Sequence, residues 1–306
     1  MRNILIWICI LGLLGISETS QAALQTGGER PADYLLFGVG GREVAMGQSG
    51  IADPSGLAAA FLNPALITSV RTLQVDGQYD FLSLNRQLGY FAIGNHIHRS
   101  SISFGLSAIY FSAGNDLEYR LGPSYNPIST FGDTEMTFLL SLGTQVLPNW
   151  TMGVNLKYFF QSIFNVGGWG GGIDFGTQWK VAALTRVAAV VQDAFSILQF
   201  PGSSSGIFPP TYQVGISQQI PDWNLIGDGD LVWSSDLQFQ PRVGVEWKPW
   251  PELALRGGYG NSGVTGGFGI LLQGSTTSEA FDYTLFPDAI EPGNMLYQIN
   301  LSLKFL

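Results

Sequence analysis

Apolar and polar side chains alternate with a period of two in long runs from about residue 69 to the C-terminus. Residues 151–160 show this clearly, because every second residue is apolar and most of those between are small or polar. The same alternation recurs in 242–248 and 296–305. A period of two is the signature of a β-strand whose faces meet different environments. The sequence therefore predicts an all-β chain over 69–306.

The low charge content favours a membrane β-barrel over a soluble β-sandwich. Only 12% of residues are charged and 45% are hydrophobic, whereas soluble domains carry about 25% charge. No stretch after the N-terminus has the roughly 18 consecutive apolar residues of a membrane helix. Apolarity confined to one face of each strand is typical of a transmembrane antiparallel barrel. Aromatic residues that would form an interfacial girdle fit this fold, namely Trp150, Tyr158, Phe160, Trp247 and Trp250.

About fourteen runs are bounded by turn signals, and an even number suits a bacterial barrel with both ends in the periplasm. Connections after even-numbered strands should then be short, and those after odd-numbered strands longer and extracellular. Residues 113–132, 194–208 and 287–293 fit the longer class, although 82–86 is short. The predicted strands are 69–81, 87–96, 100–112, 133–147, 150–162, 167–180, 184–193, 209–220, 228–235, 239–249, 251–260, 263–273, 279–286 and 294–306.

Residues 1–22 have the three parts of a cleavable secretory signal peptide. Arg2 supplies the positive charge, residues 4–16 form the apolar run, and the small residues before the cleavage site are Ser20 and Ala22. The single cysteine of the chain lies inside this peptide. We therefore expect export through the periplasm to the bacterial outer membrane, with no disulfide.

Residues 23–68 precede the strands and do not alternate. They are rich in Gly and Ala, and 55–62 is a candidate short helix. Pro64 fixes its own φ and pushes Asn63 to extended geometry, and an asparagine side chain can satisfy nearby backbone groups. A disordered leader is the alternative, but it would gain nothing from so many apolar residues. These are Leu35, Leu36, Phe37, Met46, Leu57, Phe61 and Leu62.

Two stretches carry motifs. The first has a glycine-rich opening, an Ala-Met-Gly step and an Asn-Pro-Ala step, at Gly38, Gly40, Gly41, Ala45-Met46-Gly47 and Asn63-Pro64-Ala65. The second has a Leu-Arg-x-Gly-Tyr core at 255–259 and a Gly-x-Gly at 267–269. Together they resemble the FadL/TodX-like outer-membrane transporters, closest to the PorV/PorQ-type branch, over about a quarter of the chain. The family has an aromatic before Asn-Pro-Ala and Gly-Leu after it, where this chain has Leu62 and Leu66-Ile67.

The resemblance implies a fourteen-stranded barrel whose N-terminal segment, 23–68, folds into the lumen as a hatch. It implies passage of hydrophobic small molecules, fatty-acid-like or aromatic. In the PorV branch it implies instead a type IX-like secretion subunit that binds partner proteins at its loops. The modest loops of this chain favour transport. The expected gating residues of the hatch are Gly40, Gly41, Met46, Asn63, Pro64 and Ala65.

Charged residues on the polar faces of the strands are candidates for the lumen lining. They either line a conduit or form ion pairs that hold the hatch, and the second is favoured because charges in a low-dielectric interior need partners. The same face assignment predicts that Leu156→Arg costs about 2–4 kcal/mol in lipid, and that Asn155→Arg costs much less. The predicted lumen-lining residues are Lys157, Arg242, Glu246 and Arg256.

No pattern indicates an enzyme, a metal site or a cofactor. His96 and His98 lie two apart, but no third ligand has suitable spacing, so they are interpreted as flanking a turn. The GGWGGG run at 167–172 lacks the following helix of a phosphate loop, and its glycines are interpreted as allowing curvature or close backbone approach. The net charge of −9 excludes the basic surface that nucleic-acid binding needs.

Overall fold

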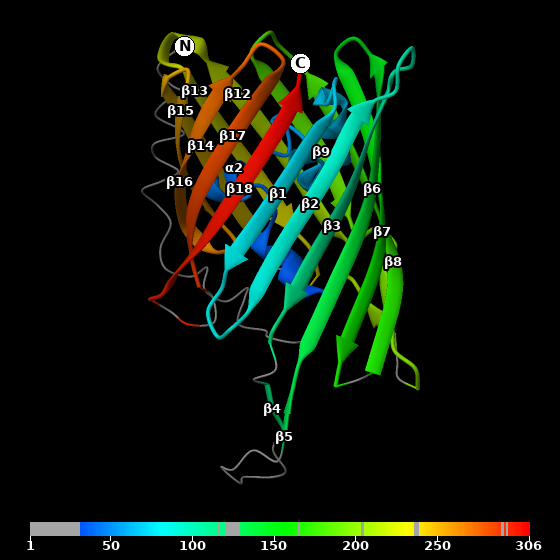
Figure 1. Cartoon of the computed structure of the whole chain (residues 1–306). Coiled ribbons are helices and arrows are strands. Elements are labelled where there is room, and N and C mark those ends of the chain that lie inside the picture. Colours follow the sequence, from blue (N-terminus) through cyan, green and yellow to red (C-terminus); the bar gives the residue numbers. More distant parts are fainter. Residues whose placement is uncertain are drawn as a thin grey trace.

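The structure, a computed structural model, describes residues 31–114, 117–119, 129–164, 166–202, 205–235, 239–288, 291 and 293–306. The predicted signal peptide, 1–22, lies outside these ranges. Within them, one sheet of 16 strands contains a closed ring of fourteen, and β10 and β11 form a short side branch (Figure 1). The ring closes because β1 pairs with β18 and β8 pairs with β9. The predicted fourteen-stranded antiparallel barrel is confirmed.

The ring strands follow one another in sequence order, and each is antiparallel to the next. They are β1 (Gln74–Phe81), β2 (Gln87–His96), β3 (Ile102–Ser112), β6 (Asp133–Leu147), β7 (Trp150–Ile163), β8 (Val166–Lys180), β9 (Thr185–Gln192), β12 (Thr211–Ile220), β13 (Leu225–Trp233), β14 (Gln240–Trp250), β15 (Leu253–Gly260), β16 (Gly263–Gln273), β17 (Thr277–Pro287) and β18 (Met295–Phe305).

The two ends of the barrel differ in their connections. At the end where β1 begins and β18 ends, here called the turn end, all connections are short, and one contains the 3-10 helix η4 (Pro221–Trp223). At the opposite end, here called the loop end, the long connections follow β3, β9 and β17, as predicted (Figure 1). Proline at 148, 221 and 251 begins or lies beside three of the tight turns, where a fixed φ is favourable.

The predicted strand limits are confirmed to within three residues, except at the first strand. That strand begins at Gln74 rather than 69, because Pro64 begins a 3-10 helix, η3 (Pro64–Ser69), that continues past the predicted boundary. The sequence analysis also missed four short strands inside the long connections. These are β4 (Leu117–Tyr119) and β5 (Ser129–Phe131) after β3, and β10 (Ile197–Gln199) and β11 (Gly206–Ile207) after β9.

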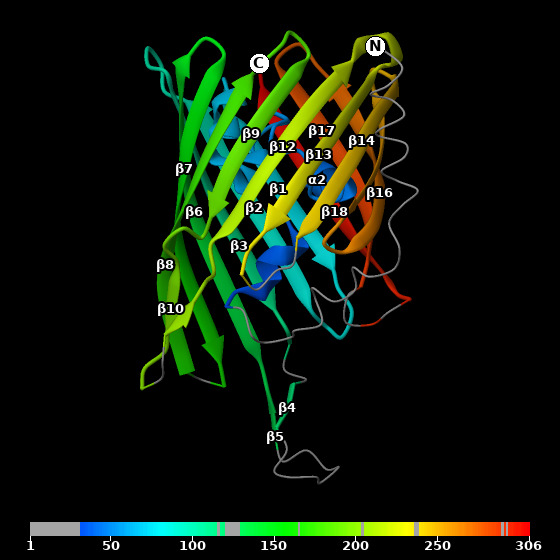
Figure 2. The same ribbon diagram turned by 180° about the vertical axis from the view of Figure 1, so that it is seen from behind.

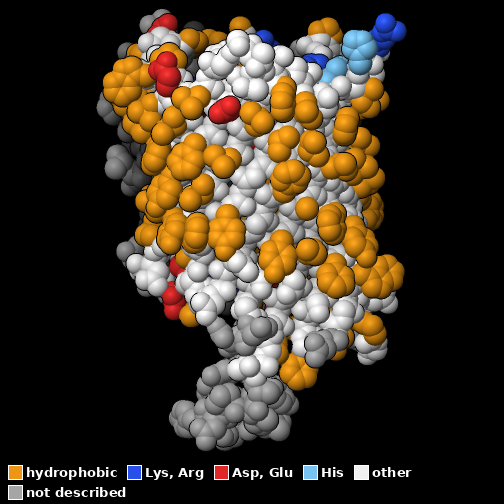
Figure 3. Space-filling view, in the orientation of Figure 1, with side chains coloured by type: hydrophobic (Ala, Val, Ile, Leu, Met, Phe, Trp, Pro, Cys, Tyr) orange, Lys and Arg blue, Asp and Glu red, His pale blue; other side chains and the backbone are white. Residues whose placement is uncertain are grey.

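The outer surface of the barrel is apolar, and the inward face of the strands is mostly polar. On β7, the outward Leu156 is 45% exposed, whereas its neighbour Asn155 is fully buried. Side chains of the hydrophobic class cover the visible wall of the barrel, and charged ones gather near its ends (Figure 3). This is the distribution of a transmembrane barrel with lipid outside.

No helix among the described residues is long and apolar enough to span a membrane.

The hatch, residues 23–68, is described from residue 31 onward and lies inside the barrel (Figures 1 and 2). It contains η2 (Asp33–Phe37), α2 (Gly41–Ala45), α3 (Ala59–Leu62) and the start of η3. The candidate helix at 55–62 is shorter than predicted. Gly56 has a φ of 140°, which prevents an earlier start, and the residue before Pro64 is disfavoured in the α conformation.

Candidate functional site

The Asn-Pro-Ala step forms a rigid turn against the barrel wall. Asn63 is extended, with φ −148° and ψ 111°, as expected before proline. Its Oδ1 accepts a hydrogen bond from the Ala65 amide at 3.0 Å, and its Nδ2 donates to the carbonyl oxygens of Ile51 at 2.7 Å and Thr177 at 3.3 Å. One side chain thus joins two parts of the hatch to strand β8.

Glycines on the inward faces of β7 and β8 make room for this turn. A Cβ atom on Gly153 would lie 2.6 Å from the Ala65 nitrogen, and one on Gly176 would lie 2.9 Å from Cδ of Pro64. Any larger residue at either position would displace the turn, because real Cβ contacts are longer. Small residues between the apolar positions of 151–160 were evident in the sequence, but which glycines the hatch contacts was not.

Gly40 and Gly41 place the start of α2 against β1, β17 and β18. The Gly40 amide donates to Oε1 of Gln78 at 2.6 Å, and its φ of 87° favours glycine. A Cβ atom on Gly41 would lie 2.7 Å from Cβ of Asp282 and 3.0 Å from Cβ of Asn300. Both glycines therefore serve close packing of the hatch against the wall.

Met46 follows the last residue of α2 and is fully buried. The inward faces of β14 and β15 carry glycine where Met46 approaches. Cβ atoms built on Gly244 and Gly258 would lie 2.7 Å from Met46 Cβ and 2.5 Å from Met46 O. The six hatch residues named from the sequence thus mark two contact areas on opposite walls of the lumen.

A buried ion network joins α2 to the wall. Arg42 contacts Asp53 at 2.6 Å and Glu246 at 2.8 Å, and Arg256 contacts Glu246 at 2.7 Å and Asp282 at 2.5 Å. The two arginines face three carboxylates, and each carboxylate contacts at least one guanidinium, as buried charges require. This is the arrangement expected of pairs that hold the hatch.

Glu43, the next hatch residue, accepts a hydrogen bond from the Ser55 hydroxyl at 2.6 Å. Burial raises the pKa of the Glu43 carboxyl, against the lowering effect of the nearby Arg42. The hatch therefore holds a carboxyl whose ionised form is disfavoured by its surroundings.

The other two predicted lumen-lining residues lie apart from this network. Lys157 on β7 contacts Asp174 at 2.7 Å and Asp193 at 2.8 Å. Arg242 on β14 donates to the Gln48 carbonyl at 3.2 Å and to Oδ1 of Asn261 at 3.1 Å. The four residues are all buried, but they form three separate clusters rather than one row.

The packing around Asn155 argues against the expected tolerance of an arginine there. Asn155 faces the lumen as predicted, but its Nδ2 donates to the carbonyl of Ala60 in α3 at 3.0 Å and to Asp174 at 3.2 Å. It is fully buried beneath the hatch. An arginine there would require displacement of α3, so we expect Asn155→Arg to destabilise the protein rather than to be tolerated.

An apolar cluster fills part of the lumen, which the sequence analysis did not foresee. In it Tyr34 and Phe37 of η2 stack on Phe111, with ring centroids 5.4 and 6.4 Å apart, and Phe159 stacks on Phe208 at 4.7 Å. The sequence did contain a signal for this cluster. In 88–93 and 158–160, apolar residues occupy both the odd and the even positions of the strand, so some of them must point into the lumen. Other buried members are Val39, Leu57, Ile67, Leu88, Tyr90, Ile109, Leu139 and Leu198.

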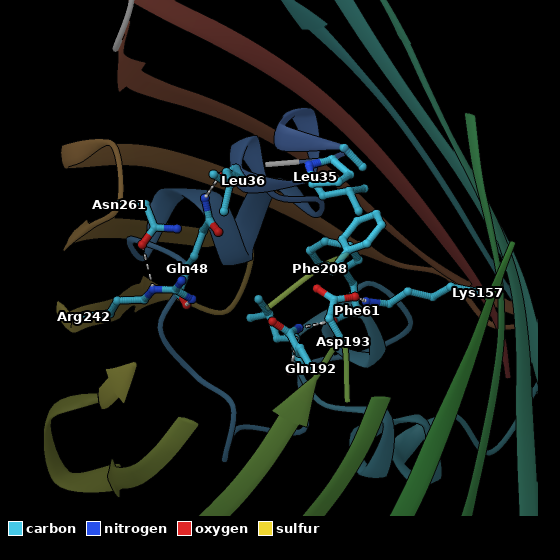
Figure 4. Close-up of a pocket in the computed structure, with 13 residues that line it drawn as sticks. Leu35, Leu36, Gln48, Phe61, Lys157, Gln192, Asp193, Phe208, Arg242 and Asn261 are labelled. Atoms are coloured by element: carbon cyan, nitrogen blue, oxygen red, sulfur yellow. Dashed lines mark hydrogen bonds and ion pairs between the residues drawn. The ribbon is translucent and has the colours of Figure 1, made fainter. Parts of the chain in front are cut away.

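Two cavities lie on either side of the hatch. The first, of about 50 Å³, has a mixed lining (Figure 4). Its apolar side chains include Leu35, Leu36, Phe61 and Phe208, and its polar ones are Gln48, Lys157, Gln192, Asp193, Arg242 and Asn261. The second, of about 510 Å³, is lined largely by charged and polar groups near the turn end. Its lining includes Arg42, Glu43, Asp53, Asp76, Arg186, Glu246, Lys248, Arg256, Glu279, Asp282 and Lys304.

The histidines and the glycine run occupy structural positions. His96 ends β2, where its Nδ1 lies 3.1 Å from Oγ of Ser103, and His98 is exposed in the following turn. In the GGWGGG run, Cβ atoms on Gly168 and Gly170 would lie 2.6 Å from the Phe200 ring and 2.8 Å from Cα of Leu198. The interpretation of close backbone approach fits this geometry. Among the described residues, no three His, Cys, Asp or Glu side chains are grouped to hold a metal ion.

Comparison with known proteins gives a likeness of fold. No protein-family model matches the chain, and no curated protein is significantly similar in sequence. Among solved structures, the toluene transporter TodX of Pseudomonas putida matches with a TM-score of 0.61 at 13% identity, over 88% of this chain and 97% of that one. The toluene transporter TbuX of Ralstonia pickettii matches with 0.56 at 17%, over 89% and 98%.

This chain has the fold of those channels. A FadL homologue from Pseudomonas aeruginosa shares it as well, with a TM-score of 0.54 at 12% identity, over 87% of this chain and 96% of that one. The likeness covers 87–89% of this chain, and it is a likeness of fold to these structures.

Proposed function

We propose that this chain is a bacterial outer-membrane channel for hydrophobic small molecules, fatty-acid-like or aromatic. Its outer surface is apolar enough to contact outer-membrane lipid, and its fold is that of proteins described as toluene transporters. The hatch blocks the lumen and gates passage, with Gly40, Gly41, Met46, Asn63, Pro64 and Ala65 as the contacts that hold it closed.

The observation that carries this proposal is the apolar cluster shared by the hatch and the wall. A lumen that conducts polar solutes is lined by polar groups, whereas here Tyr34 and Phe37 of the hatch pack on Phe111 of β3. A hydrophobic solute that enters at the loop end therefore meets apolar side chains at the surface of the hatch itself. The polar cavity at the turn end lies beyond the hatch.

Deletion of residues 33–60 tests the gating role. Because these residues fill the lumen, we expect a large new single-channel conductance in planar bilayers. Faster entry of a fluorescent hydrophobic probe, N-phenylnaphthylamine, into vesicles with a lipopolysaccharide outer leaflet should accompany it. Deletion of 117–131, the β4–β5 hairpin, is the matched control and should leave conductance unchanged. If wild-type vesicles take up the probe no faster than protein-free vesicles, hydrophobic transport is ruled out.

A second candidate is the secretion subunit of the PorV/PorQ type. The observation that favours it is the β4–β5 hairpin, which projects beyond the barrel wall at the loop end (Figure 1) and offers a surface for a partner protein. The same two deletions separate the candidates. A channel that stays closed without residues 33–60, together with a secretion defect on removing 117–131, would favour the secretion role.

A further inference from the structure

The connection between β9 and β12 folds back over the lumen face of β8. Its β10 pairs with β8 through Ile197–Gly171, Leu198–Gly170 and Gln199–Trp169, and Figure 2 shows β10 beside β8 near the loop end. Residues 193–200 and 206–208 are here called the strap. The inward glycines of β8 are what allow it to approach, since a Cβ on Gly172 would lie 2.9 Å from Cβ of Ser196.

A cluster of charged residues holds the start of the strap against β7 and β8. Lys157 Nζ lies 2.8 Å from Oδ1 of Asp193, whose amide donates to Oδ1 of Asp174 at 2.8 Å. Ser196 donates to the same Asp193 oxygen at 3.0 Å. At the other end of the strap, Phe208 stacks on Phe159. Lys157, predicted from sequence as a lumen-lining charge, is therefore the barrel's anchor for this segment.

The strap and the hatch, the two walls of the small cavity, are held to the barrel in different ways. The hatch, which forms the facing wall, is fixed by the Asn63 hydrogen bonds and the Arg42 ion network. The strap has three residue pairs to β8, and β11 pairs only with β10 among the described residues. Sparse strand pairing is a property of segments that open locally.

We propose that the strap is a gate over this cavity, pinned by the Lys157–Asp193 ion pair, and that it opens to admit an apolar ring-sized compound. The proposal rests on the proposed transport function. The cavity, of about 50 Å³, is too small for such a ligand, since a dry cavity of about 150 Å³ is one that accepts benzene. One wall must move, and Phe208 and Asp193 belong to the strap, whose strand pairing with the barrel is limited to three residue pairs.

Opening is measured first, without any substrate. Leu198→Cys places a reporter thiol on the strap at a position that is 2% exposed, so a water-soluble maleimide reaches it only when the strap opens. Adding Asp193→Ala should speed labelling about 10- to 100-fold, the effect of losing a hydrogen bond between charged groups. Adding Asp222→Ala, on the exposed η4 turn, is the matched control. Equal labelling rates in the two double variants would overturn the gate.

Passage of a hydrophobic compound is measured next, with a disulfide that holds the strap to β8 and can be reduced again. Gly171 and Ile197 are antiparallel partners, whose Cα separation of about 4.5–5.5 Å suits a disulfide. In the double variant Gly171→Cys/Ile197→Cys, oxidation should reduce N-phenylnaphthylamine uptake at least tenfold, and reductant should restore it. The single variants should respond to neither. If oxidation leaves uptake unchanged, the strap is not a gate. If neither the reduced variant nor the wild-type protein takes up the probe, the transport function is overturned. Maleimide labelling then decides whether the strap opens.

Discussion

Individual glycines decide how closely the hatch can approach the wall. Strand glycines weaken a sheet, since they lack a side chain to pack and lose more entropy on folding. In this barrel the inward ones make room instead for backbone of the hatch, as Gly153 does for the Pro64–Ala65 peptide. The loss of strand propensity is offset by a contact that no larger residue permits.

Gly153→Ala tests this role at the residue scale. Its Cβ would lie 2.6 Å from the Ala65 nitrogen, so we expect the Asn-Pro-Ala turn to shift and the barrel to lose about 1–3 kcal/mol, as overpacked sites do. Gly227→Ala, whose Cβ would meet nothing within 4 Å, is the matched control and should be neutral or stabilising. Urea unfolding in detergent micelles measures both. Equal stability of the two variants would contradict the assigned contact.

At the scale of the element, the described part of the hatch, from residue 31, is held by side chains because it has no strand pairing with the barrel. The helices in this part are five residues or fewer apart from η3, which has six, too short to be stable alone. The position of α2 depends on Arg42, which is 204 positions from Glu246 in sequence. An element of this kind is fixed by its surroundings and can be released by changing a few contacts.

Arg42→Gln should loosen the hatch while leaving the barrel closed. Loss of the guanidinium leaves Asp53 without its cation, and breaking a buried pair costs about 3–5 kcal/mol. We expect more frequent opening events in single-channel recordings and faster proteolysis of the hatch. Lys248→Gln removes a contact to the same Glu246, at 3.3 Å, from a side chain that is 39% exposed. This control should behave as wild type, since exposed pairs contribute little.

At the scale of the whole molecule, closure of the ring gives each of its fourteen strands a partner on both sides. β18 is the closing element because it pairs with β1 over 74–81 and with β17 over 277–287. Unpaired backbone groups cannot remain in lipid. The barrel therefore forms as a complete ring or does not insert.

Deletion of residues 297–306 should abolish membrane assembly, because it leaves β1 and β17 with open edges. Folded barrels resist SDS and migrate differently before and after heating, which gives the measurement. A chain lengthened or altered at 117–131, in the loop-end hairpin, should still show the heat-dependent shift. Membrane-inserted, heat-modifiable protein lacking 297–306 would show that β18 does not close the ring.

The sequence alone determined the fourteen strands of the ring and their faces, because alternation with a period of two is a local property of an extended chain, but it did not show the four short strands in the long connections. It also determined the conformation of Asn63, which follows from the proline beside it. Contacts between distant residues were decided only by tertiary structure. The facing of Gly153 to Pro64, the pairing of Arg42 with Glu246 and the anchoring of the strap by Lys157 each depend on the curvature and register of a closed ring, which no local pattern encodes. Asn155 shows the consequence: alternation places it on the inward face, but only the packed hatch makes that face intolerant of a larger side chain.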